Sequence, residues 1–366
     1  MKNRITAVGA ALCLILTLPG CASLLERSYS SSAPHVDRPT VAEDPSVLRA
    51  ENYRELVSAV LYLVSQGAEG GTIQLHDYAG AVEADLTAAC AEVATEDPLG
   101  AYCVDYIKHE YIRVVSDYQA TLNIRYRRTQ EQVRSMVKVT GTGAIRTELQ
   151  EALSRFSEET VLRVAYFSED EGSIQALVRQ AYYDTPAAAL GLPGVEIALY
   201  PDSGRERVVE ILLTYPESAE ELRRKSEILS ARVKELAREL QGLEERGVAE
   251  AAVPTAQYSP QGNTPYAVLV EGMANPEGMA LAYALLCQEG GLSCEVVEGS
   301  LNGEPRFFNQ VTFSDGSAAY VDLMGDSPSL TEEREMADRG YLWPGTPGGE
   351  GPEEGPKTRH ILGETE

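Results

Sequence analysis

Positive charge is scarce in this sequence. The 366 residues include 31 Lys and Arg against 56 Asp and Glu, which gives a formal net charge of −25 at pH 7. A chain of this sign repels phosphate backbones and anionic lipid headgroups, so it is unsuited to nucleic acid and to broad contact with anionic membranes. The acidity is explained more simply as a feature that keeps the protein soluble.

Cysteine and histidine are also few, with six and four residues. Cys90 with Cys103, and Cys287 with Cys294, form two near pairs, but neither pair has the close spacing or histidine neighbours of a zinc site. We therefore expect no metal site and no cofactor. Outside the cytoplasm the even count suits two local disulfides, and buried free thiols are the alternative.

Long apolar runs are missing beyond the first 20 residues. At the start, Lys2 and Arg4 precede an apolar run over residues 5–18, which is shorter than the roughly 20 residues that a membrane-spanning helix needs. A short basic region followed by such a run is typical of an export signal. Cys21 follows Leu-Pro-Gly, an ending that resembles a bacterial lipobox, although Pro19 departs from the small or branched residue usual there.

This resemblance implies that residues 1–20 are a lipoprotein signal peptide and that Cys21 becomes the lipidated first residue of the mature protein. Acyl chains such as palmitate contribute about 0.8 kcal/mol per buried CH₂, so a multiply acylated cysteine would hold the protein on a membrane surface. We expect an exported protein anchored at the outer face of the cell membrane or at another envelope membrane. The alternative is an ordinary secretory peptide.

The rest of the chain divides by composition. Residues 21–46 are rich in Ser, Pro and charge and are expected to form a flexible tether. Residues 345–366 are rich in Gly, Pro and Glu and are expected to be a disordered tail. Residues 47–216 are interpreted as one N-terminal α/β domain. Apolar periodicity there predicts helices over 52–66, 81–93, 130–137, 145–156 and 173–183, and strands over 120–126, 161–167, 195–200 and 207–215.

A strong helical pattern follows at residues 217–247, where apolar residues recur at steps of seven, four and three from Leu222 to Leu243. Such a stripe can form a coiled-coil seam, but at fewer than four heptads it more often packs against a neighbouring domain. Residues 244–261 are interpreted as a polar connector.

The stretch from Thr264 to Leu323 has a defined order of elements. A helix is expected to begin near Asn275, with Pro276 in its first turn, and to end at Gly290-Gly291. Strands are expected over 293–298, 307–313 and 318–323, with Asn302-Gly303 and Asp315-Gly316 as the turns between them.

This order resembles the core of the transglutaminase-like superfamily, relatives of papain-type cysteine proteases, and implies such a domain over residues 251–344. Where the family has Cys-Glu-Gly at the helix start, this chain has Pro276-Glu277-Gly278. Where the family has His-Ala-Trp-Asn, it has Arg306-Phe307-Phe308-Asn309. The family's aspartate is matched by Asp322. The fold class is accordingly α+β, with an N-terminal α/β domain, a long connecting helix and a transglutaminase-like C-terminal domain.

The substitutions remove the chemistry that the resemblance implies. Catalysis there needs a thiolate nucleophile and an imidazole that accepts and returns a proton. Pro276 has no nucleophile, and Arg306 stays charged at every accessible pH. We therefore predict a pseudoenzyme without catalytic residues, in which Asp322 pairs with Arg306 as a structural salt bridge.

A degenerate groove of this kind is expected to bind a peptide, a peptidoglycan stem or an envelope protein, with Arg306 attracting a carboxylate and Phe308 and Asn309 beside it. Two alternatives remain. One is an active cell-wall peptide transferase or hydrolase with a non-standard site. The other is an architectural oligomerisation module whose interface is the helix over 218–243.

Overall fold

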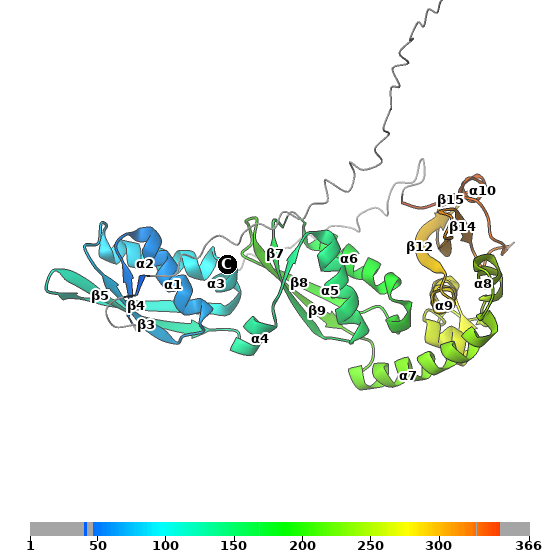
Figure 1. The fold of residues 1–366 in the computed structure, drawn as a ribbon, viewed down its shortest axis with the longest axis horizontal. Helices are drawn as coiled ribbons and strands as arrows, with labels where there is room; N and C mark the ends of the chain where they lie inside the picture. The colour runs from blue at the N-terminus through cyan, green and yellow to red at the C-terminus, as the bar shows by residue number, and fades with distance from the viewer. Residues whose placement is uncertain (1–39, 42–46, 168, 327, 345–366) are drawn as a thin grey trace, which may run out of the picture. The chain divides into compact units, whose positions relative to one another are not determined.

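The structure is a computed structural model, and it describes residues 40–41, 47–167, 169–326 and 328–344. Helices and strands are interspersed along the chain, which confirms the α+β class (Figure 1). The predicted signal peptide, Cys21 and the C-terminal tail lie outside the described residues. Within these residues, no helix has both the length and the apolar character needed to cross a bilayer.

The first sheet has the strand order β1-β2-β3-β5-β4. β2 and β3 pair in parallel, and the other neighbours are antiparallel. β1 lies within the segment predicted to be a tether. The strands are β1 (Thr40–Val41), β2 (Val47–Ala50), β3 (Gly70–Leu75), β4 (Val104–Val114) and β5 (Asp117–Tyr126).

Three helices accompany this sheet, namely α1 (Tyr53–Ser65), α2 (Val82–Thr95) and α3 (Pro98–Cys103). α1 begins where the side chain of Asn52 accepts a hydrogen bond from the Glu55 amide at 3.1 Å, which satisfies one of the unpaired donors of the first turn. The buried residues of α1 recur at helical spacing, so the predicted amphipathic helix is confirmed.

A second sheet follows within the segment predicted as one domain. Its order is β6-β7-β9-β8, with β6 (Val137–Thr140), β7 (Glu159–Ala165), β8 (Gly194–Tyr200) and β9 (Arg207–Thr214). The accompanying helices are α4 (Gln130–Ser135), α5 (Thr142–Ser154), α6 (Glu171–Asp184) and the short 3₁₀ helix η1 (Pro186–Ala188). The predicted helices and strands are present, but the two sheets have largely separate apolar cores.

The third sheet, near the C-terminus, has the order β14-β13-β12-β15 and is antiparallel throughout. Its strands are β12 (Ser293–Leu301), β13 (Glu304–Thr312), β14 (Ala318–Val321) and β15 (Tyr341–Leu342). The same region contains β10 (Gln257–Tyr258), the π-helix η3 (Ala267–Glu271), β11 (Met273–Ala274), α9 (Pro276–Glu289) and α10 (Glu333–Asp338).

The predicted long helix is α7 (Ala219–Leu236), continued by the 3₁₀ turn η2 (Ala237–Leu240). Leu222, Leu229 and Val233 are buried in the same core as α9. The stripe therefore packs within its own chain and is not free to form a coiled coil. The predicted polar connector is partly wrong, because α8 (Glu245–Ala251) buries Val248 and Ala249 in that core.

Candidate functional site

The start of α9 occupies the position where the resembled family carries its nucleophile. The side chain of Asn275 accepts a hydrogen bond from the Gly278 amide at 2.9 Å, and Pro276 is the first helical residue. Gly278 is required by close approach, since a Cβ there would lie 2.0 Å from the Gly262 carbonyl oxygen. The predicted helix start is confirmed, and Pro276 presents no nucleophile.

Arg306 and Asp322 form the predicted ion pair. The Arg306 Nε donates to one carboxylate oxygen of Asp322 at 2.5 Å, and its Nη2 donates to the other at 3.2 Å. The Tyr341 hydroxyl and the Met324 amide also donate to this carboxylate, each at 2.9 Å. The side chain of Asp322 is only 4% exposed, so all four donors act in a largely dry environment. Sequence reasoning missed Tyr341, which lies 19 residues beyond Asp322.

The ion pair lies on the opposite face of the sheet from α9. Asn309 on β13 donates from Nδ2 to the Ala280 carbonyl of α9 at 2.9 Å, so its side chain faces that helix. Side chains alternate along a strand, which turns Arg306 and Phe308 to the other face. Pro276 and the Arg306–Asp322 pair are therefore separated by the sheet and do not converge as a papain-like triad does.

Phe308 and Asn309 are not placed to line a groove. Each is about 1% exposed. Phe308 packs in a small aromatic core, 5.4 Å from the ring of Tyr341 and 5.5 Å from that of Trp343. Asn309 joins β13 to α9, and its Oδ1 has no hydrogen-bond partner among the described residues. A ligand cannot reach these side chains without opening the core, so the expectation that they form a binding groove needs correction.

A polar cluster beside Pro276 was not predicted. The Tyr183 hydroxyl of α6 donates to the Glu277 carboxylate at 3.0 Å, and the Tyr183 ring lies 5.5 Å from that of Phe307. Arg179, one turn before Tyr183, forms a bidentate pair with Glu298 at 2.6 and 2.7 Å. Burial raises the pKa of Glu277 and of Tyr183. Since Tyr183 and Glu277 lie 94 residues apart, no local sequence pattern indicates this contact.

The cysteines that could supply an alternative nucleophile are buried free thiols, so the structure contains neither of the two candidate disulfides. Burial raises the pKa of Cys90 to about 11 and that of Cys103 to about 12, and it also raises the pKa of Cys294. A raised pKa lowers the thiolate fraction, which is the reactive form. The described residues contain no group of three or more His, Cys, Asp and Glu arranged to hold a metal ion.

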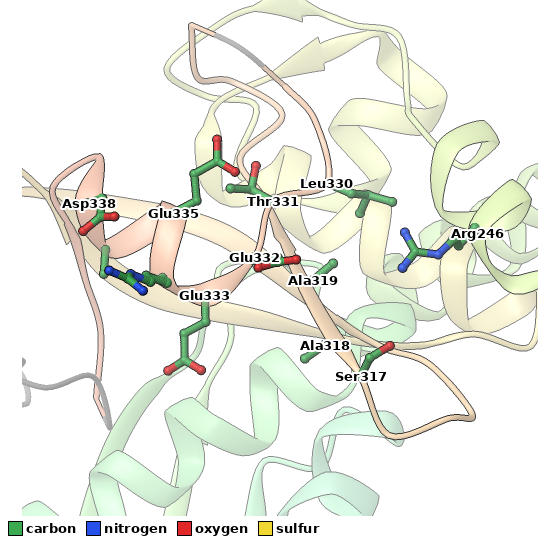
Figure 2. A pocket seen from close by; sticks show the side chains of 12 residues that line it. Arg246, Ser317, Ala318, Ala319, Leu330, Thr331, Glu332, Glu333, Glu335 and Asp338 are labelled. Carbon is green, nitrogen blue, oxygen red and sulfur yellow. The ribbon is translucent and has the colours of Figure 1, made fainter.

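An open cavity of approximately 900 Å³ lies along the end of β14 and α10 (Figure 2). Thr331, which lines the cavity, forms reciprocal backbone hydrogen bonds of 2.8 Å with Tyr320 of β14. Arg246, whose guanidinium lies 4.9 Å from the ring centre of Phe313, flanks the cavity. Sequence reasoning did not single out the acidic residues that line it, which are Glu332, Glu333, Glu335 and Asp338.

Comparison with known proteins gives little. No family model matches the sequence, and no curated protein matches it. Among solved structures, one similar chain is a candidate protease from Parabacteroides distasonis, at 11% identity and a TM-score of 0.20. The match covers 71% of this chain and 40% of that one, so this chain spans about two fifths of that protein. A likeness of this strength carries no argument about activity.

Proposed function

We propose that the protein is a lipid-anchored envelope protein whose transglutaminase-like domain binds a peptide without catalysing a reaction on it. The observation that carries the proposal is the pairing of Arg306 with Asp322. It neutralises the charged groups at two positions that the family resemblance assigns to catalysis and holds them on the sheet face away from α9. The proposal also includes the assignment of the C-terminal domain to the transglutaminase-like superfamily and the lipid anchor on Cys21.

The residues around Pro276, which stands where the resembled family has its nucleophile, support a non-catalytic role. Pro276 begins α9, and burial raises the pKa values of Cys90, Cys103 and Cys294, whereas a thiolate nucleophile needs a lowered pKa. His109 lies on β4 and His76 lies beside the first sheet, so neither histidine is within the C-terminal sheet. The described part of that sheet thus offers neither an activated thiol nor an imidazole.

Binding is assigned to the cavity along β14 and α10. Four carboxylates and two guanidinium groups line it, so its charge favours a peptide with free amino or guanidinium groups. The cavity also follows the edge of β14, where Tyr320 is bridged to Thr331 but Ala318 and Ala319 have no second strand beside them among the described residues. An extended peptide could add main-chain hydrogen bonds at such an edge. This location replaces the groove expected from Arg306, Phe308 and Asn309.

The test is a titration of the full chain with a short lysine-containing peptide and with its amine-acetylated counterpart. We expect the free amine to bind more tightly, and the double variant Glu333→Lys, Asp338→Lys to weaken binding by about tenfold. Glu220→Lys reverses an equally exposed charge on α7 and serves as the matched control. Equal binding of both peptides, or binding unchanged in the double variant, would refute this assignment.

The active-enzyme alternative has one observation in its favour. Glu277 follows Pro276 directly, has a raised pKa and bonds to Tyr183, and perturbed carboxyl groups are enriched at catalytic sites. Incubating the protein with cell-wall peptides distinguishes an active enzyme from a binding module. Cleavage or transfer that is lost in Glu277→Gln supports the enzyme, whereas peptide recovered unchanged supports the binding module.

A further inference from the structure

β4 is an unusually exposed edge strand. It spans 11 residues and pairs only with β5 among the described strands, as the long hairpin of Figure 1 shows. Tyr106, Tyr111 and Val114 are exposed, and Ile112 is 63% exposed. A long edge with exposed apolar side chains is a ready template for pairing with another chain. The sequence of the strand indicates which chain that is.

The charges of β4 are complementary to themselves when the strand is read in reverse. Residues 105–113 are Asp-Tyr-Ile-Lys-His-Glu-Tyr-Ile-Arg. If two copies lie antiparallel with His109 opposite His109, then Lys108 faces Glu110, and Asp105, which lies in a β-bulge between Val104 and Tyr106, comes near Arg113. Each of these opposite-charge pairs occurs twice because the arrangement is symmetric. The apolar residues match as well, with Tyr106 opposite Ile112 and Ile107 opposite Tyr111.

We propose that two copies of this chain join edge to edge through antiparallel pairing of β4, with the twofold axis at His109. The first sheets of the two copies then form one continuous sheet. The occupant of the edge is a second copy of this chain, because the charge pattern is complementary to itself. This surface lies on the first sheet and is independent of the peptide-binding role of the C-terminal domain.

The faces of the strand agree with this register. His109 lies opposite the buried Leu122 of β5, and its Nε2 is 3.2 Å from the Thr87 hydroxyl of α2, so it points to the covered face. Lys108 and Glu110 flank it and therefore point to the other face. In antiparallel pairing about residue 109, each side chain meets a partner on its own face. The His109 Nδ1, which lacks a hydrogen-bond partner among the described residues, lies beside the symmetry axis.

Charged residues on an edge strand also have a simpler explanation, namely that they prevent association. Charges that only prevent association have to be present on the strand, but they do not have to be complementary to each other about a twofold axis. The two explanations therefore differ in what happens when charges are exchanged between positions. Under the protective explanation, the chain is a monomer whichever of the two positions carries the lysine.

The experiment measures the mass of the full chain in solution for the natural sequence and for Lys108→Glu and Glu110→Lys. We expect a dimer for the natural chain. Either single variant places like charges opposite each other at two symmetric contacts, which should raise the dissociation constant by about tenfold or more. Both residues are exposed on β4, so the variants should fold normally.

Mixing the two single variants is the decisive step. In the mixed pair, the carboxylate introduced at position 108 of one chain faces the ammonium group introduced at position 110 of the other. The natural Glu110 of the first chain likewise faces the natural Lys108 of the second. A heterodimer should therefore form from two chains that dimerise poorly alone.

The exchange variant Lys108→Glu, Glu110→Lys should dimerise like the natural chain, because it restores opposite charges at both symmetric contacts. Lys138→Glu and Glu196→Lys, on the edge strands of the second sheet, are matched controls that should leave the dimer intact. A monomeric natural chain, or single variants that dimerise as well as it does, would overturn the proposal.

Discussion

At the scale of single residues, the Arg306–Asp322 pair is predicted to stabilise the C-terminal domain. Removing the guanidinium in Arg306→Ala leaves a carboxylate that is 4% exposed with only Tyr341 and Met324 as donors. Breaking a buried pair in this way costs about 3 kcal/mol. We expect a corresponding loss in the free energy of unfolding, measured by urea denaturation.

A second variant separates pairing from packing. Arg306→Met with Asp322→Asn removes both charges together and keeps an amide oxygen that can accept from Tyr341 or Met324, and removing a buried pair as a whole is often neutral. We expect it to recover most of the stability that Arg306→Ala loses. Unchanged stability in Arg306→Ala would contradict a structural role for the pair.

Glu277 is predicted to make stability depend on pH. Burial raises its pKa, so the folded chain binds this proton more tightly than the unfolded chain. Stability from this group is therefore present at low pH and is lost as pH rises from the ordinary glutamate value of about 4.3 through the raised one. Glu277→Gln keeps an oxygen that can accept from Tyr183 and removes the charge.

We therefore expect Glu277→Gln to melt at a higher temperature than the natural chain at pH 7, with the difference shrinking toward pH 4. Thermal melts over this range measure it, with Glu227→Gln on the exposed face of α7 as control. A Glu277→Gln variant that is less stable at pH 7 would show that the carboxylate is favoured by its surroundings.

At the scale of elements, α7 is predicted to act through its own core. Leu229 is 1% exposed among the residues that pack against α9. Leu229→Ala should cost about 2–5 kcal/mol in unfolding free energy through the cavity it leaves. The exposed neighbour Glu227→Ala should change little. An unfolding free energy that is unchanged in Leu229→Ala, measured by urea denaturation, would contradict this packing.

Elements with strong local signals could be predicted from the sequence. α9 has an Asn275 cap, a proline at its first position and a Gly-Gly end, and each of these acts through the backbone of neighbouring residues. The pairing of Arg306 with Asp322 was predicted from the family resemblance, which places Asp322 where the aspartate orients the histidine and Arg306 where that histidine stands. The contact of Tyr183 with Glu277 could not be predicted, because it joins distant elements through tertiary packing.

There is also a physical reason why the sequence did not predict β4 and β3 as strands. β4 carries charged residues on both faces because it is an edge strand, so its apolar alternation is weak. β3 begins with two glycines, which lack the branched side chains that mark a strand. Gly70 is needed there, because a Cβ would lie 2.5 Å from the backbone carbonyl oxygen of Leu122 on β5.

At the scale of the whole molecule, membrane attachment is predicted to depend on one residue. The chain carries a formal charge of −25, which disfavours broad contact with anionic lipid headgroups. Acyl chains on Cys21 would supply attachment at about 0.8 kcal/mol per buried CH₂. In Cys21→Ser cells we expect no incorporation of labelled palmitate and loss of the protein from the membrane fraction. Cys13→Ser, within the same predicted signal peptide, should keep both. Labelling that persists in Cys21→Ser would show that another residue is acylated, and membrane retention without label would show that protein contacts hold the chain there.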